Sequence, residues 1–243
     1  IRFMIFKRLY AMSDETSKKL AVLIDADNAQ ASLCNELFSE VSKYGLANVK
    51  RAYGDWTTTN LKGWKEHLHK HAIQPIQQFS YTTGKNSTDS SLIIDAMDLL
   101  HDGNLDGFCL ISSDSDFTRL ANRLRESGII VYGFGEEKTP DAFISACNLF
   151  IKTENLRKTK AAKDFSDDKD LKELISNALS ATSKDDGWSL LSAVGSYINK
   201  NESSFDSRTY GYEKLGGLVK SLTYLKTETR EVGGVSHLYV TSV

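Results

Sequence analysis

Two short, uniformly apolar runs that end in acidic loops constrain the fold of this chain more than any other feature. Leu20 to Ile24 leads into Asp25-Ala-Asp-Asn28, and Gly107 to Ile111 leads into Ser112-Ser-Asp-Ser-Asp116. A run of about five residues without alternation between apolar and polar positions is typical of a strand that is buried on both faces. Such strands belong to parallel sheets that helices cover on both sides.

Helical and extended patterns alternate around these runs. We expect helices over residues 29–44, 61–71, 89–100, 117–126 and 140–146, and further strands over residues 48–53, 73–81, 129–134 and 149–152. This alternation predicts βαβ units, and therefore an α/β fold with a parallel sheet flanked by helices. Ligands bind beyond the carboxyl ends of the strands in such sheets, so the two acidic loops meet at one edge where their strands are neighbours.

The second half of the chain has a different pattern. Residues 153–168 are polar and charged, which is typical of a linker. Beyond them we expect helices at residues 171–179, 188–198 and 212–222, and strands at residues 225–229 and 237–241. Three helices and a hairpin predict a small winged helix-turn-helix domain. We therefore divide the chain into an extension (1–17), an α/β domain (18–155), a linker (156–168) and a winged-helix domain (169–243).

The composition of the chain limits the cellular compartment and the partners that we expect for it. Hydrophobic residues make up 40% of the 243 residues and the net charge is only −2, so nucleic-acid binding requires a local basic patch. No apolar run approaches the roughly 20 residues that span a bilayer. The first residues lack the features of a signal peptide, and Met4 and Met12 are both candidate starts. Three separated cysteines without a C-x-x-C motif argue against both a disulfide framework and a zinc site, and favour a reducing, cytoplasmic setting.

The acidic residues in and near these loops have the chemistry of a metal site. Asp25 and Asp27 follow the first strand, Asp114 and Asp116 follow the strand at residues 107–111, and Asp89 opens a predicted helix. Gathered carboxylates repel one another, and Mg²⁺ or Mn²⁺ prefers such oxygen ligands. A bound metal can lower the pKa of a water and stabilise charge on a phosphodiester. Aspartate is also a favoured helix N-cap, which leaves a capping role open for Asp27, Asp89 and Asp114.

Two further groups of side chains each have two interpretations. Asp95 lies in an apolar helical stretch, so it either supports the site or faces solvent. His67, His69 and His71 form an H-x-H-x-H pattern in a predicted helix, where only the first and last share a face. No other ligand for zinc is evident in the sequence, and a solvated helix face is the preferred interpretation.

The motifs of the first half resemble a known family. Leu23-Ile-Asp25-Ala-Asp-Asn28, Lys85 with Thr88-Asp89, and Ile111-Ser-Ser-Asp114-Ser-Asp116-Phe117 resemble the NYN domain, LabA-like branch, which has the PIN-like nuclease fold. The resemblance covers residues 19–155 and implies a metal-dependent ribonuclease. It assigns Asp25, Asp89, Asp114 and Asp116 to the family's acidic metal cluster, and Asn28 to a polar position that can hold a water or a phosphate oxygen. Lys85-Asn-Ser-Thr-Asp89 is one residue longer than the Lys-Gly-x-Asp of many relatives, so Lys85 is either a phosphate contact or a solvated lysine.

The C-terminal part resembles a second family. Gly187-Trp188, Ala193-Val-Gly195 and the run from Phe205 to Leu215 resemble an OST-HTH, or LOTUS, domain, which implies RNA binding or docking of a protein partner. Residues 164–243 contain 9 Lys and Arg against 12 Asp and Glu, so any RNA contact must be local. Candidates for that contact are Arg208, Tyr210, Tyr212, Lys214 and Lys220. The alternative is that the tyrosines belong to the core and the lysines to a solvated face.

An RNA endonuclease that uses Mg²⁺ or Mn²⁺ is the leading functional hypothesis, and a homodimer is compatible with it. One alternative is a non-catalytic RNA-binding adaptor, in which the aspartates are relics or caps. A second is a haloacid-dehalogenase-type phosphatase, because Asp25-Ala-Asp27 fits a D-x-D motif whose first residue forms an aspartyl-phosphate. The spacing of Asp114 and Asp116 does not match that family. A dinucleotide site is disfavoured because no G-x-G-x-x-G follows the first strand.

Overall fold

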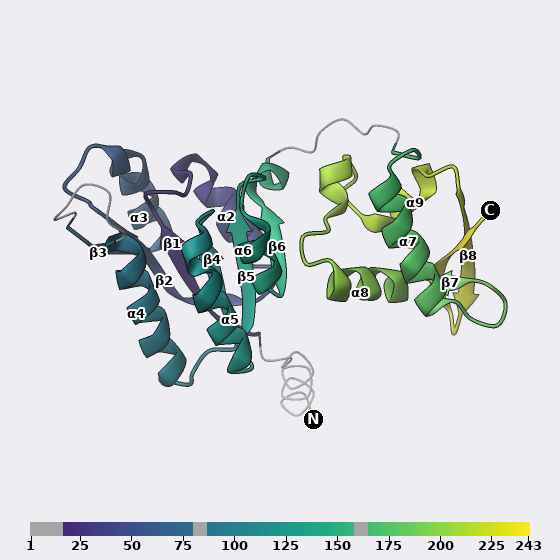
Figure 1. The fold of residues 1–243 in the computed structure, drawn as a ribbon, viewed down its shortest axis with the longest axis horizontal. Coiled ribbons are helices and arrows are strands. Elements are labelled where there is room, and N and C mark those ends of the chain that lie inside the picture. The colour runs from purple at the N-terminus through teal and green to yellow at the C-terminus, as the bar shows by residue number, and fades with distance from the viewer. Residues whose placement is uncertain (1–16, 80–86, 158–164) are drawn as a thin grey trace, which may run out of the picture.

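The computed structural model describes residues 17–79, 87–157 and 165–243. Most of the expected N-terminal extension, the loop with Lys85 and the centre of the expected linker lie outside the described residues. The described part contains two bodies with separate hydrophobic cores, an α/β domain and a smaller C-terminal domain (Figure 1). Within the described ranges, no helix combines the length and apolar character needed to cross a membrane.

A six-stranded parallel sheet forms the centre of the first domain. Its strands are β1 (Lys19–Asp25), β2 (Leu46–Gly54), β3 (Gln74–Gln77), β4 (Gly107–Ile111), β5 (Ile130–Gly135) and β6 (Leu149–Lys152), in the order β3-β2-β1-β4-β5-β6. The chain builds outward from β1 on one side and then outward from β4 on the other. The point where the order reverses therefore lies between β1 and β4, which is where ligands bind in sheets of this kind.

Helices cover both faces of this sheet, as the apolar strands require. The first face carries α4 (Ser87–His101), α5 (Thr118–Glu126) and α6 (Asp141–Ala146), and the second carries α2 (Cys34–Val41) and α3 (Lys65–His71). Alternate residues of β1 divide between the two cores: Ala21 and Leu23 pack with the first set of helices, and Leu20, Val22 and Ile24 pack with the second.

The predicted elements of this domain are present with shifted ends. The helix expected at 29–44 begins as the 3-10 turn η1 (Ala31–Leu33), and the helix expected at 61–71 begins as η2 (Asn60–Trp64). Helix α4 begins two residues before its expected start at Asp89. Strand β3 lies at the sheet edge, where Pro75, which has no backbone N–H, is tolerated.

The C-terminal domain contains α7 (Lys169–Thr182), α8 (Leu191–Asn201) and α9 (Leu215–Ser221), with the 3-10 turn η5 (Ser207–Tyr210). Strands β8 (Leu225–Val232) and β9 (Val235–Ser242) form the expected hairpin around two glycines with φ of 62° and 79°. The prediction of a helix from Trp188 was wrong at its start. Ser189–Leu190 forms β7, which pairs with β9 as a third strand, and the helix begins only afterwards.

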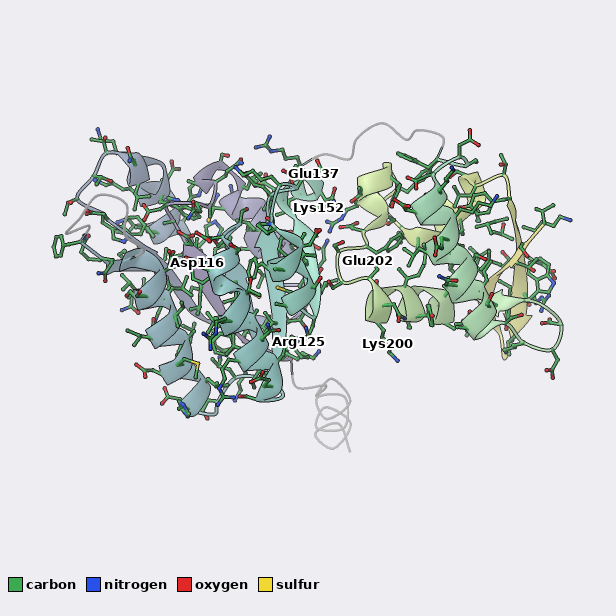
Figure 2. All side chains as sticks on the ribbon, in the orientation of Figure 1. Asp116, Arg125, Glu137, Lys152, Lys200 and Glu202 are labelled. Carbon is green, nitrogen blue, oxygen red and sulfur yellow. The ribbon has the colours of Figure 1, made fainter. Side chains whose placement is uncertain are left out.

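The two domains contact each other through named polar pairs. The backbone N–H of Phe150 in β6 donates to the carbonyl oxygen of Ser203 at 2.8 Å, and Asn155 donates to the Thr209 hydroxyl at 2.9 Å. Figure 2 shows Lys152 and Glu202 on the sides of the two domains that face each other. The segment after α8 therefore lies along the β6 side of the sheet.

Candidate metal centre

Asp25 occupies the most buried position of the candidate site. It ends β1, its side chain is fully buried, and its Oδ2 atom accepts hydrogen bonds of 2.7 Å from Ser112 Oγ and from Asn28 Nδ2. Its Oδ1 atom is buried and has no hydrogen-bond partner among the described residues. A buried carboxylate oxygen without a partner is costly, and a bound cation would satisfy it.

Three further aspartates converge next to this position. Asp89, Asp114 and Asp116 each offer a carboxylate oxygen, and these oxygens lie within 4.8 Å of one another. Asp25 is outside this triplet, but among charged groups it exerts the largest effect on Asp89. The chain thus brings together three of the four predicted metal ligands and places the fourth beside them.

Each aspartate reaches the site from a different local structure. Asp114 is the N-cap of the 3-10 turn η3 (Ser115–Phe117), and its Oδ1 atom accepts a 2.9 Å hydrogen bond from the backbone N–H of Asp116. Asp89 lies in the first turn of α4. Asp27 does not cap η1, because the N-cap of that turn is Gln30. Capping and clustering are therefore compatible at Asp114, where the sequence presented them as alternatives.

Burial and neighbouring negative charge together raise the pKa values of two aspartates at this site. Burial raises the pKa of Asp25, although hydrogen bonds from Asn28 and Ser112 act in the opposite direction. Burial, together with the charges of Asp25, Asp114 and Asp116, raises the pKa of Asp89 to about 6. A divalent cation bound here would favour the ionised carboxylates and so oppose both shifts, because it offsets the negative charge that adds to the effect of burial.

Ser112 contacts the site, although no role was expected for its side chain from the sequence motifs. Strands β1 and β4 pair with Ile24 opposite Ile111, so the residues that follow them, Asp25 and Ser112, come to lie side by side. The Ser112 hydroxyl also accepts a 3.1 Å hydrogen bond from the backbone N–H of Asp114. Ser112 therefore links the two acidic loops. The signal available in the sequence was its position: Ser112 directly follows an apolar strand, as Asp25 does.

Asp95 is half-buried and contacts two residues of β2. It forms an ion pair with Arg51 and accepts a hydrogen bond from the hydroxyl of buried Tyr53. Tyr53 is the β2 residue that pairs with Asp25 in the sheet. The Asp95 network thus ties α4, which carries Asp89, to the strand beside Asp25.

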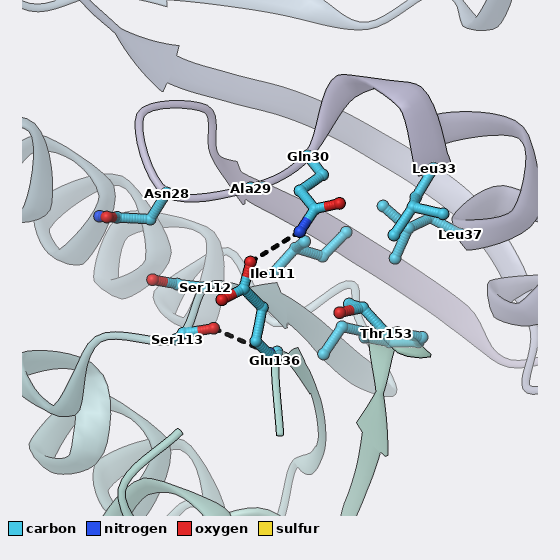
Figure 3. A pocket seen from close by; sticks show the side chains of 12 residues that line it. Asn28, Ala29, Gln30, Leu33, Leu37, Ile111, Ser112, Ser113, Glu136 and Thr153 are labelled. Atoms are coloured by element: carbon cyan, nitrogen blue, oxygen red, sulfur yellow. Dashed lines mark hydrogen bonds between the residues drawn. The ribbon is translucent and has the colours of Figure 1, made fainter. Parts of the chain in front are cut away.

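An open groove of about 300 Å³ adjoins the cluster. It is lined by Asn28, Ser113, Asp114, Ser115, Glu136, Lys138 and Pro140. Figure 3 shows the neighbouring pocket, in which Gln30 donates to the Glu136 carboxylate at 2.7 Å and the Glu136 backbone N–H donates to Ser113 at 2.8 Å. Glu136 also pairs with the exposed Lys138 at 2.8 Å. The groove therefore has an acidic end at Asp114 and a cation at Lys138.

The predicted RNA contacts of the C-terminal domain separate into two kinds. Arg208 is engaged within the protein, since it pairs with Asp206 at 2.6 Å and with Glu40 of the α/β domain at 2.9 Å. The Tyr210 ring packs edge-on against Phe165 with 5.0 Å between centroids. The remaining candidates are the exposed Lys214 and Lys220, and the half-buried Tyr212, which packs against the domain core. Lys85 lies outside the described residues.

The fold and the site together define a class of protein. It is an α/β protein in which carboxylates gather at the ends of the two central strands of a parallel sheet. This chain belongs to the NYN domain family, whose model matches residues 19–156. The OST-HTH/LOTUS domain model matches residues 166–237. NYN domains have the PIN-like fold, are generally nucleases and are typically dependent on divalent metal, and OST-HTH/LOTUS domains bind RNA and mediate protein interactions. The resemblances drawn from the sequence motifs are confirmed for both domains.

Comparisons with individual proteins add little. No curated protein matches the chain. A protein of unknown function from Vibrio parahaemolyticus RIMD 2210633 is 17% identical with a TM-score of 0.48, over 57% of this chain and 94% of its own. An uncharacterized protein from Nitrosomonas europaea is 36% identical over 36% of this chain and 78% of its own, with a TM-score of 0.28. A protein from Chromobacterium violaceum is 38% identical over 30% of this chain and 78% of its own, with a TM-score of 0.27.

Proposed function

We propose that this chain is an RNA endonuclease that hydrolyses phosphodiester bonds with Mg²⁺ or Mn²⁺ held by its aspartates. The observation that carries the proposal is the convergence of Asp89, Asp114 and Asp116 beside a buried oxygen of Asp25 that has no hydrogen-bond partner among the described residues. Four carboxylates in one place form a ligand set for a hard divalent cation. Family membership supports the same reaction class.

The aspartates would hold the cation, and neighbouring side chains would position them. When bound, the cation supplies a water of lowered pKa and stabilises the charge that develops on the phosphate. Ser112 and Asn28 orient the Asp25 carboxylate through their 2.7 Å hydrogen bonds. Asp95 performs a similar role at one remove, because it anchors α4 to β2.

RNA is the proposed substrate because a domain of an RNA-binding family follows the nuclease domain in the same chain. The groove beside Asp114 offers room for the backbone, with the exposed Lys138 as a cation for its phosphates. Lys85 and Lys214 are kept as proposed RNA contacts, whereas Arg208 and Tyr210 support the protein's own packing. The same domain is also a proposed docking site for a protein partner. We also propose that the protein forms a homodimer and that it is cytoplasmic. The three free cysteines suit a reducing compartment.

Digestion of single-stranded and structured RNA by the full chain tests the proposed activity. We expect cleavage with Mn²⁺, loss of cleavage in EDTA, and loss in Asp114→Asn. The matched control is Asp98→Asn, which removes an exposed carboxylate from α4 outside the cluster and should cleave normally. The proposal would be refuted if no sample cleaved RNA and Asp114→Asn were indistinguishable from the wild type.

Metal titration distinguishes a nuclease from a non-catalytic RNA-binding adaptor. The nuclease predicts Mn²⁺ binding that weakens strongly in Asp25→Asn, because that variant removes the charge of the buried carboxylate. An adaptor predicts RNA binding that neither EDTA nor this substitution changes. Membership of the NYN family argues against the haloacid-dehalogenase-type phosphatase.

A further inference from the structure

A second group of ligand-type side chains lies on the sheet face covered by α2 and α3. Cys34, His67 and His71 each offer one ligand atom, and these atoms lie within 4.8 Å of one another. The sequence alone showed two histidines on one face of a helix and no third partner. The fold supplies that partner from α2, because this helix begins at Cys34 and contacts α3 through Asn35 and Phe38, which both touch His71.

The two histidines have the positions that metal ligands on a helix require. They are four residues apart, so both rings leave the same face of α3, with 6.3 Å between their centroids. The Nδ1 atom of His67 is buried and has no hydrogen-bond partner within the described part of the chain. A buried ring nitrogen of this kind is unusual, since buried polar atoms are normally satisfied.

Neighbouring side chains orient these rings. Asn35 Oδ1 lies 3.0 Å from His71 Nε2, which is the contact that commonly fixes the ring of a metal-binding histidine. Phe38 stacks on His71 with 4.9 Å between ring centroids. The rings of Trp64 and His67 form a T-shaped contact with 6.4 Å between centroids. The aromatic rings limit the rotation of both imidazoles, so the ligand atoms remain close to one another.

The chemistry of these ligands selects a different cation from that of the aspartate cluster. Imidazole and thiolate bind Zn²⁺ and similar first-row metals, whereas Mg²⁺ prefers oxygen. In tetrahedral zinc sites the ligand atoms are about 3.4–3.6 Å apart, as follows from bond lengths of about 2.1 Å to nitrogen and 2.3 Å to sulfur. Because the observed separations do not exceed 4.8 Å, movements of no more than about 1 Å would bring the three atoms to these distances.

We propose that Cys34, His67 and His71 form a zinc-class metal site that joins α2 to α3, separate from the aspartate centre. The fourth position of the metal would be open to water or another ligand. Burial raises the pKa of the Cys34 thiol to about 11, so the thiol is protonated in the metal-free protein. Binding then releases this proton to solvent, and the occupied site carries one net positive charge.

Absorption spectroscopy with Co²⁺ as the probe tests the site in the full chain, with excess Mg²⁺ present to occupy the aspartates. We expect one Co²⁺ per chain, a sulfur-to-cobalt charge-transfer band, the intense visible bands of a four-coordinate site, and displacement by Zn²⁺. Cys34→Ser should abolish the charge-transfer band. His67→Asn should weaken binding more than about tenfold, since even the loss of a supporting contact costs metal sites 10–100-fold.

Two control variants keep the outcomes interpretable. His69→Asn replaces an exposed histidine on the same helix and should bind Co²⁺ like the wild type. Asp114→Asn removes an aspartate ligand and should also leave the charge-transfer band unchanged, so this site and the proposed nuclease can fail independently. No charge-transfer band in the wild type, or an undiminished band in Cys34→Ser or His67→Asn, would overturn the proposal. Circular dichroism of each variant identifies any loss that is due to misfolding.

Discussion

Replacing Asp89 by asparagine should stabilise the metal-free protein while it destroys metal binding. Asp89 is buried, and its carboxylate lies within 4.8 Å of those of Asp114 and Asp116. Asparagine has nearly the same shape and no charge, so the substitution removes both the cost of burying an ionised carboxylate and its repulsion by the neighbouring aspartates, without leaving a cavity. The aspartates would thus be retained for their ligand chemistry at a cost in stability.

The size of the effect follows from the pKa of Asp89, which rises from 3.8 to about 6 on folding. A difference of about two units corresponds to about 3 kcal/mol against the ionised form at neutral pH. The variant gives up about 0.3–1 kcal/mol that a carboxylate gains in the first turn of a helix. The expected net gain for Asp89→Asn is therefore about 2 kcal/mol at pH 7, as an order of magnitude.

The pH dependence has a defined sign. Because the folded pKa of Asp89 is raised, the wild type is favoured while this group is protonated, and the advantage is lost as pH rises from 3.8 to about 6. The stability of Asp89→Asn relative to the wild type should therefore increase between pH 3.8 and about 6. Near pH 4 the two proteins should differ far less than at pH 7.

Urea denaturation in EDTA at both pH values measures the difference, with Asp98→Asn as the exposed control on the same helix. Saturating Mn²⁺ should reverse the order, because a ligand at 100 times its Kd adds about 2.7 kcal/mol to the wild type alone. A variant that is less stable than the wild type in EDTA at pH 7 would refute the argument from repulsion. So would a gain in stability that persists unchanged at pH 4.

Three further outcomes are expected from the same structure. Ser112→Ala removes a 2.7 Å hydrogen bond to Asp25 and should lower Mn²⁺ affinity about 10–100-fold by titration, with the fold retained by circular dichroism. Arg208→Ala should cost about 1–3 kcal/mol in urea denaturation, because it deprives the buried Glu40 of one of its two cations. Burial opposes ionisation of Glu40, but hydrogen bonds from Arg208 and Lys43 lower its pKa below 4.5, so this loss should shrink as pH falls through that range. The variant Phe165→Ala should melt below the wild type by circular dichroism, because the Phe165 ring packs on the core of the C-terminal domain.

The order of the main elements could be predicted because it depends on local patterns. The apolar runs of β1 and β4, and the acidic residues that follow them, are contiguous in sequence. Periodicity also located α4, α5 and α7. The expected domain boundaries stay predictions, and much of the expected linker lies outside the described residues.

The missed features depend on contacts between distant segments. Ser189–Leu190 is too short to show a strand pattern, and it becomes one only by pairing with β9 about 50 residues later. Ser112 contacts Asp25 because of the β1–β4 register, and the proposed role of Cys34 depends on its closeness to two histidines of α3. No local pattern contains such information, because each partner lies in a different element.

The contact between Phe150 and Ser203 also affects how the chain behaves in solution. β6 is an edge strand, and unpaired edges promote association of sheets from different molecules. The Ser203 carbonyl takes up the Phe150 backbone N–H, while at the opposite edge Pro75 has no N–H to offer. One edge is thus protected by an imino acid and the other by the neighbouring domain. Removing the C-terminal domain would expose β6 and promote aggregation, whatever becomes of RNA binding.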